Sequence, residues 1–241
     1  MRLNNPVVTG VKSVLVMALL LLLLYAPLLS RIRQQYIDGY VDYFEKNIAN
    51  GAPGAEDEID VPDSDLFVIE GEEDGYEEEE LNMSFLKEEA DKESALDEYK
   101  NRDSSLKLIG VIEIPSIDTK VPVWEGVSVK ALRFGVGRYP LSADLGSDMG
   151  NCFIMGHRNR HLSTIFCRLQ YVKVGDQVLV TTKNESEIEY KVTKIEAVPP
   201  DKIVDYMALR ENDPGMLTLC TCLTERGKGW RFIAQCTKSE F

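Results

Sequence analysis

Short β-prone runs separated by turn residues fill the chain from Leu106 almost to its end. This pattern predicts many short strands, which is typical of a closed or nearly closed β-barrel. Two short helices are expected between the strands, at residues 164–170 and 203–210, and no internal repeat is present. The predicted strands cover residues 108–114, 121–124, 152–155, 177–182, 188–195, 216–222 and 230–236.

The acidity of the chain is confined to one segment. The net charge is −13, but residues 51–100 alone hold 20 Asp and Glu against 3 Lys and Arg, a balance of −17. Residues 101–241 hold 17 acidic and 19 basic residues, so the β-rich region is close to neutral. Since no basic patch stands out, nucleic-acid binding has little support. Low hydrophobicity with high net charge favours disorder from about residue 50 to residue 80.

An uncharged run rich in Leu, Val and Ala covers the 17 residues 13–29. This length is at the short end of what spans a bilayer. A cleaved signal peptide is the alternative, but its apolar region is usually shorter and ends at an Ala-x-Ala-like site, which the sequence around Tyr25 lacks. The run therefore favours a retained membrane anchor. Basic residues on both sides leave its orientation open.

Three residues suited to nucleophilic and acid–base chemistry lie in the β-rich region. Cys222 ends a predicted strand, and cysteine has appreciable thiolate near neutral pH. The chain has only two histidines, so the search for a partner base is short. His157 follows an apolar strand that ends in glycine, whereas His161 lies in a polar loop and is expected to be solvent-exposed. Arg231 keeps its charge under working conditions, which suits it to stabilising an oxyanion.

Each of these residues also has a structural interpretation. Free cysteine is among the most buried residue types, so Cys222 could be a core thiol. His157 could be a hydrogen-bonded core imidazole, and Arg231 could be a solvated edge residue or half of an ion pair. Arg226 is a rival cation, but its neighbourhood is typical of a flexible loop.

Cys220 and Cys222 could be imagined as zinc ligands with His157. The usual zinc spacings have at least two intervening residues, and the chain has no second such pair, so neither a metal nor a cofactor is expected. A papain-like protease would place its cysteine before its histidine, the reverse of the order here. The five cysteines are an odd number, which leaves at least one thiol free if the others pair.

The same residues resemble the motifs of the sortases, the membrane-anchored cysteine transpeptidases of Gram-positive bacteria. Residues 218–222, Thr-Leu-Cys-Thr-Cys, look like the family's TLxTC signature, and residues 156–158 resemble its Gly-His-Arg segment. Arg231 lies where the family has its essential arginine. The likeness covers roughly residues 105–236, in the family's order. It extends through residues 109–115, 121–126 and 134–137.

The resemblance implies a mostly β fold, a sortase-like eight-stranded barrel, and a two-step transpeptidation. Cys222 would attack the Thr–Gly carbonyl of an LPXTG-like sorting signal, Arg231 would steady the oxyanion, and His157 would protonate the departing amine. An incoming amine would then release the thioacyl-enzyme. Leu219 and Thr221, in the same signature, are expected to bind substrate. The implied partners are surface proteins or pilins with a C-terminal sorting signal, and an amine acceptor on a pilin lysine or a peptidoglycan precursor.

Motif spacing looks most like the pilus-assembling class C group of the family. The spacings concerned are the nine-residue gaps from His157 to Phe166 and from Cys222 to Arg231. Many members of that group carry an N-terminal lid with an Asp-Pro-aromatic motif, whereas residues 65–67 here read Asp-Leu-Phe. Protein anchoring to the cell wall and a non-catalytic, anchored peptide-binding module are the alternative functions.

The chain is therefore predicted to have three parts. Residues 1–30 form a cytoplasmic stub and a transmembrane anchor, and residues 31–103 form a helical and acidic, partly disordered tether or lid. Residues 104–241 form the catalytic barrel. The resemblance implies a single-pass protein of the cell membrane with an extracellular catalytic domain.

Overall fold

A computed structural model describes residues 6–62, 105–158, 165–185, 187–207, 212–227 and 229–239. His161, the Asp-Leu-Phe stretch at residues 65–67 and most of the acidic segment lie outside the described residues. The lid interpretation of that segment therefore stays a prediction.

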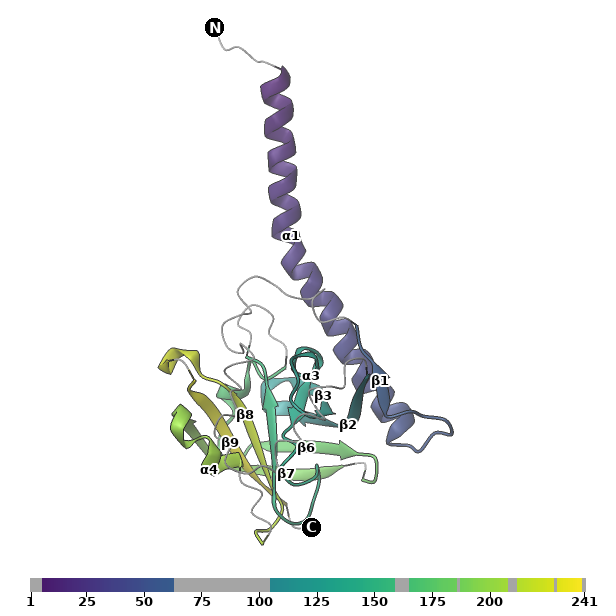
Figure 1. Cartoon of the computed structure of the whole chain (residues 1–241), viewed down its shortest axis with the longest axis vertical. Helices are drawn as coiled ribbons and strands as arrows, with labels where there is room; N and C mark the ends of the chain where they lie inside the picture. The colour runs from purple at the N-terminus through teal and green to yellow at the C-terminus, as the bar shows by residue number, and fades with distance from the viewer. Residues whose placement is uncertain are drawn as a thin grey trace, which may run out of the picture.

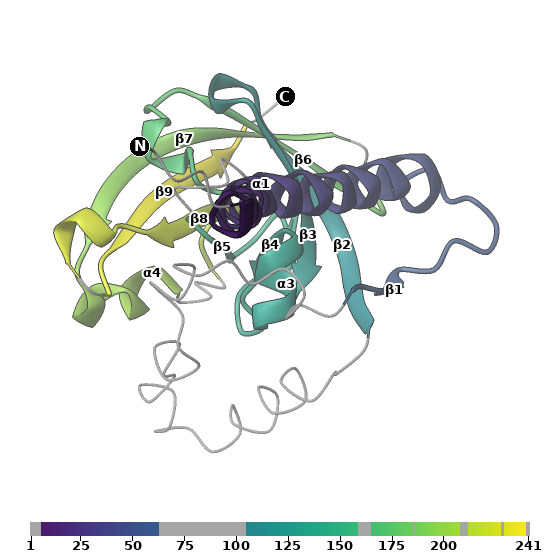
Figure 2. The ribbon, with the colours of Figure 1, turned by 90° about the horizontal axis from the view of Figure 1, so that it is seen from above.

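Eight strands close into a barrel (Figures 1 and 2). In the order β2-β3-β4-β5-β8-β9-β7-β6, neighbouring strands pair, and β6 returns to pair with β2 from Gly110↔Thr182 to Glu113↔Leu179. The β3–β4 and β5–β8 pairs are parallel. The predicted mostly β, eight-stranded barrel is thus confirmed. The strands are β2 Ser105–Ile114, β3 Thr119–Glu125, β4 Val136–Arg138, β5 Asn151–Gly156, β6 Gln177–Thr182, β7 Ile188–Val198, β8 Met216–Cys222 and β9 Arg231–Lys238.

Alternation along β5, β8 and β9 separates two apolar clusters, because successive side chains of a strand point to opposite faces. The interior cluster draws on all eight barrel strands and includes Ile154, Leu219 and Ala234, each fully buried. The next residues along, Met155, Cys220 and Ile233, belong to a second cluster on the outer face. Helix α3 (Val129–Phe134) contributes Leu132 to the outer cluster, and helix α4 (Val204–Met207) contributes Met207. The outer face of this part of the sheet is therefore covered in part by two short helices.

The helix α1 (Pro6–Tyr43) lies along the barrel with its C-terminal half and projects away from it with its N-terminal half (Figure 1). The ring of Tyr40 packs edge-on at 5.1 Å from Trp124 of β3, and Phe44, in the π-helical turn that continues the helix, is fully buried in the same cluster. In a second anchoring contact, Lys120 Nζ lies 2.8 Å from Glu45 Oε1. Among the described residues, no helix is both long enough and apolar enough to cross a membrane.

Residues 51–62 differ from the disorder expected of the start of the acidic stretch. They include β1 (Glu58–Asp60), which pairs antiparallel with the start of β2, from Glu58↔Lys107 to Asp60↔Ser105. Ile59 packs against the cluster under α1, and Val61 is buried in it. Ile59 and Val61 thus dock this short segment although acidic residues surround them. A charge balance taken over residues 51–100 does not reveal such isolated apolar positions.

The structure also adds short elements that periodicity did not reveal. Strand β4 has three residues, and a side chain at its central Gly137 would meet the Gly126 carbonyl oxygen at 2.3 Å. Helix α4 lies within residues 203–210, where a helix was expected, and residues 208–210 are outside the described residues. In the described part of residues 164–170, where a second helix was expected, the chain forms turns that end in the 3₁₀ turn Leu169–Tyr171. The remaining short helical segments are the π turn η1 Phe44–Ile48 and the 3₁₀ turns η4 Pro115–Ile117, η5 Leu169–Tyr171, η6 Pro200–Lys202 and η7 Thr224–Arg226.

Docking of α1 on the barrel can be tested by truncating Phe44. Because this side chain is fully buried, Phe44→Ala should lower the free energy of unfolding by about 3–5 kcal/mol. Urea unfolding followed by tryptophan fluorescence measures the change. Lys46→Ala removes an exposed ion pair with Asp42 on the same helical segment, and should change the free energy by less than about 1 kcal/mol. Equal effects of the two substitutions would show that the helix does not pack on the barrel.

Candidate active site

The ends of three neighbouring strands bring His157, Cys222 and Arg231 to one edge of the sheet. Strands β5 and β8 run parallel, and their last paired residues are Met155↔Cys220. Two residues further along each chain stand His157 and Cys222. Strand β9 then starts opposite the end of β8, with Cys222↔Arg231 as direct cross-strand partners. Residues 65 positions apart in the chain therefore meet because both strands end at the same edge.

Cys222 and Arg231 share the outer face of the barrel, since directly opposed residues of antiparallel strands present their side chains on the same side. Cys220 belongs to the outer cluster, and Cys222 follows it by two positions, so the two thiols share that face as well. The exposed fraction is 4% for Cys222 and 9% for Arg231. The Nη1 atom of Arg231 also donates to the carbonyl oxygen of Trp230 at 3.2 Å.

The electrostatic environment keeps His157 neutral. Burial, followed by the positive charges of Arg133 on α3 and Arg33 on α1, lowers the pKa of His157 well below its ordinary value of 6.5. Both effects disfavour the imidazolium form. At neutral pH the ring is therefore unprotonated, and once protonated it is a strong proton donor.

The two cysteines of the 218–222 segment differ in their capacity to react. Cys220 is buried, and desolvation raises its pKa to about 12 although the charge of Arg231 acts in the opposite direction. A thiol with so high a pKa is not a nucleophile at neutral pH. Neither Cys220 nor Cys222 is in a disulfide. Of this pair, Cys222 at the strand end is the better placed to react.

Leu219 and Thr221 lie on the opposite face from Cys222. Leu219 is fully buried in the interior cluster, and Thr221 is fully buried with its hydroxyl donating to the carbonyl oxygen of Gly156 at 2.8 Å. In this geometry Thr221 fastens the end of β5 to the end of β8. Both side chains therefore face the interior of the barrel, whereas the sequence analysis expected them to bind substrate.

Arg158 is a residue of the site that the sequence argument named only as part of a motif. Its Nη1 atom donates to the carbonyl oxygen of Cys222 at 3.4 Å, and its Nη2 atom donates to Gln170 Oε1 at 2.6 Å. Both nitrogens also bond the carboxylate of Glu225. In the sequence, only its position next to His157 drew attention to Arg158, and nothing drew attention to Glu225. Arg226, the rival cation, is exposed on η7.

A second network fastens α4 to the sheet behind the site. Thr218, on the same strand face as Cys222, donates its hydroxyl hydrogen to Asn151 Oδ1 at 2.7 Å. The amide nitrogen of Asn151 donates to the carbonyl oxygen of Tyr206 at 2.8 Å. Because Asn151 and Thr218 are fully buried, the bond between their side chains is protected from water.

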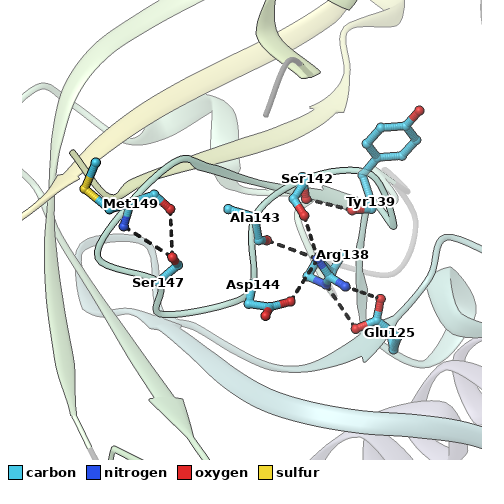
Figure 3. Close-up of polar contacts among 8 residues, drawn as sticks. All are labelled: Glu125, Arg138, Tyr139, Ser142, Ala143, Asp144, Ser147 and Met149. Carbon is cyan, nitrogen blue, oxygen red and sulfur yellow. Dashed lines mark hydrogen bonds and ion pairs between the residues drawn. The ribbon is translucent and has the colours of Figure 1, made fainter. Parts of the chain in front are cut away.

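Figure 3 shows how Arg138 fixes the segment that leads into β5. Its guanidinium forms a two-pronged ion pair with Glu125, with Nη2–Oε1 and Nε–Oε2 distances of 2.7 and 3.0 Å. The Nη1 atom donates to the carbonyl oxygens of Ser142 and Ala143 at 2.7 and 3.1 Å. Both charged side chains are nearly buried. The parallel β3–β4 pair and the following loop are therefore held as one unit.

The described residues contain no group of three or more His, Cys, Asp and Glu side chains arranged to hold a metal ion.

Comparison with known proteins identifies a family. A model of the sortase domain matches residues 112–239, more than half of the chain. The matched range includes His157, Cys222 and Arg231. Sortase A of Bacillus anthracis is 28% identical over 127 residues, which cover 53% of this chain and 58% of that protein. Sortase D of Bacillus subtilis is 30% identical over 111 residues, covering 46% and 53%. The chain thus spans little more than half the length of these curated relatives.

A solved structure gives a similar result. A lid mutant of sortase A from Corynebacterium diphtheriae superposes with a TM-score of 0.50 at 25% identity, covering 61% of this chain and 78% of that one.

The neutrality of His157 can be tested by NMR on protein with labelled histidine. The His157 ring should remain unprotonated as the pH falls through 6.5, because burial and two nearby cations oppose its charge. A His161→Gln variant assigns the signals, since the chain has only two histidines. A His157 midpoint at or above 6.5 would contradict the electrostatic description of the site.

Proposed function

This chain belongs to the sortase family, and we propose that it acts as a cysteine transpeptidase on proteins that carry a C-terminal sorting signal. The observation that carries the proposal is the strand register, which sets Cys222 opposite Arg231 and beside the end of the strand that leads to His157. A nucleophile, a proton shuttle and a fixed cation thus share one edge of the sheet, the set that acyl transfer needs.

In the first half of the reaction, Cys222 attacks the carbonyl carbon between Thr and Gly of an LPXTG-like signal. Neutral His157 takes the thiol proton, and the thiolate forms the new C–S bond. Arg231 carries a permanent charge and stabilises the oxyanion of the tetrahedral intermediate. The C–N bond then breaks, and His157 returns the proton to the departing glycine amine. The product is a thioacyl-enzyme on Cys222.

In the second half, an amine attacks the thioacyl carbon. His157 takes a proton from the amine as the C–N bond forms, and Cys222 leaves as the thiolate. The proton then passes from His157 to the thiolate, which restores the thiol and the neutral imidazole that began the reaction. The acceptor is a pilin lysine or a cell-wall peptide. Motif spacing favours the pilus-type reaction, in which a lysine of one pilin becomes the acceptor, and attachment of surface proteins to the wall is the alternative. Both reactions use the same three residues, so the acceptor must be established by experiment.

Mass spectrometry of the full chain with a panel of LPXTG-type peptides tests this function. We expect a thioacyl adduct on Cys222, and its discharge by one class of amine acceptor. Cys222→Ala should abolish the adduct. Cys220→Ala is the matched control: it removes a thiol two residues away whose pKa is raised to about 12, and it should retain the adduct. No adduct from a folded chain with reduced Cys222 would favour a non-catalytic peptide-binding module.

Membrane attachment is a further part of the proposal. It is supported by the uncharged run at residues 13–29 and by the position of this run in α1, whose opposite end packs on the barrel. The full chain should sediment with membranes after a carbonate wash, and a chain that lacks residues 2–30 should not. Protease added to intact cells should digest the barrel if it lies outside. Recovery of the full chain in the soluble fraction would refute the attachment.

A further inference from the structure

The sheet ladder between β5 and β8 stops before it reaches the residues proposed to react. Its last pair is Met155↔Cys220, and β5 itself ends at Gly156. The bond from the Thr221 hydroxyl to the Gly156 carbonyl oxygen extends the connection by one residue. His157 follows the end of β5, so regular backbone pairing does not fix its position relative to Cys222. Another interaction has to hold the two chain segments together at this point.

The side chain of Arg158 supplies such an interaction. It is only 5% exposed and bonds three segments that otherwise diverge. One is the backbone of Cys222, through the carbonyl oxygen at 3.4 Å. The second is η5, through Gln170 Oε1 at 2.6 Å. The third is η7, through both carboxylate oxygens of Glu225.

The contact with Glu225 also reaches the third residue of the site. Glu225 lies in the connection between β8 and β9, which is closed by a bond from the Leu223 amide to the Trp230 carbonyl oxygen at 2.9 Å. Arg231 follows Trp230 directly and opens β9. By holding Glu225, the guanidinium of Arg158 thus holds the loop that leads to Arg231.

We propose that Arg158 and Glu225 form a clamp that positions His157, Cys222 and Arg231 relative to one another. Arg158 is in this account a positioning residue. Its charge is neutralised by Glu225, which suits it to fixing geometry, whereas Arg231 is the cation that faces the substrate. The kinetic part of this inference rests on the proposed function, and the geometric part rests on the contacts alone.

The chemistry of the guanidinium explains why arginine is required. Its planar fork can engage a carboxylate with two donors and keep further N–H groups for the Cys222 and Gln170 oxygens. Lysine has a compact ammonium group with no such fork, so it can satisfy only part of the set. Glu225 is 45% exposed, and an ion pair with one solvated partner adds little to the free energy of unfolding. Loss of the clamp should therefore affect the rate more than the stability.

Four variants of the full chain test the clamp: Arg158→Met, Arg158→Lys, Glu225→Gln and the control Arg168→Met. Arg168 forms a surface ion pair with Asp118 at 3.6 Å, with both side chains well exposed. For each variant we would measure kcat and KM with a sorting peptide, the thermal unfolding temperature, and the pH dependence of Cys222 alkylation by iodoacetamide. Alkylation follows the thiolate and needs no substrate.

Arg158→Met should lower kcat by about 10- to 100-fold, because an error of about 1 Å in the position of reacting groups has an effect of that order. KM should stay within twofold, and the unfolding temperature should stay near that of the control. Alkylation of Cys222 at neutral pH should slow, since loss of the bond to the Cys222 carbonyl oxygen lets the thiol move away from the positive charge of Arg231, its cross-strand partner, and a nearby cation favours the thiolate. Arg158→Lys should restore part of the rate, and Glu225→Gln should cause a smaller loss. Arg168→Met should behave as the unchanged protein.

The clamp is overturned if folded Arg158→Met keeps both kcat and the alkylation profile of the unchanged protein. If Arg158→Met does not fold, Glu225→Gln decides: an unchanged unfolding temperature with reduced kcat supports the clamp, and an unchanged kcat overturns it. If the unchanged protein itself turns over no peptide, the proposed function fails, and the alkylation profiles still test the clamp. Unaltered profiles in Arg158→Met and Glu225→Gln would then reject it.

Discussion

The parallel pairing of β5 with β8 is the constraint on which the site depends. Two parallel strands end at the same edge of a sheet, so the residues that follow β5 and those that close β8 come together regardless of their separation in sequence. The antiparallel partner β9 begins at that same edge, which brings Arg231 to Cys222. Had β5 and β8 been antiparallel, His157 would lie at the far end of the sheet from Cys222.

In this arrangement the interior of the barrel and its outer face have different roles. The interior cluster, with members from every barrel strand, stabilises the closed sheet. The outer face of β5, β8 and β9 carries Cys222 and Arg231, beside a cluster that α3 and α4 cover. Consecutive residues of a strand alternate between the two faces. The segment 218–222 therefore supplies residues to the interior cluster and to the outer face alike. Leu219 packs in the interior of the barrel, and Cys222 lies on the outer face. Between Cys220 and Cys222, Thr221 points inward and joins β8 to the end of β5.

Much of the barrel was predictable because most of its strands are long enough to show apolar runs bounded by turn residues. β8 was anticipated at its observed bounds, as was β6. Strand β4 was missed because three residues with a central glycine carry no periodic signal, and β1 because its apolar residues stand among acids. The packing of α1 through Tyr40 and Phe44 depends on contacts with Trp124 and Phe134 that are distant in sequence. The candidate site was predictable as residue types, whereas the bonds of Arg158 to Cys222 and Glu225 required the fold.

The spacing of Cys220 and Cys222 along one strand has a consequence for oxidation. Residues i and i+2 of a strand have parallel side chains separated by about 6.6 Å, whereas a disulfide needs Cβ atoms about 3.8 Å apart. The two thiols therefore cannot join without a break in the strand, and Cys220 cannot act as a resolving cysteine. A sulfenic acid formed on Cys222 by peroxide has no internal thiol on this strand to capture it. Capture of that sulfenic acid by Cys220 would require the strand to open first.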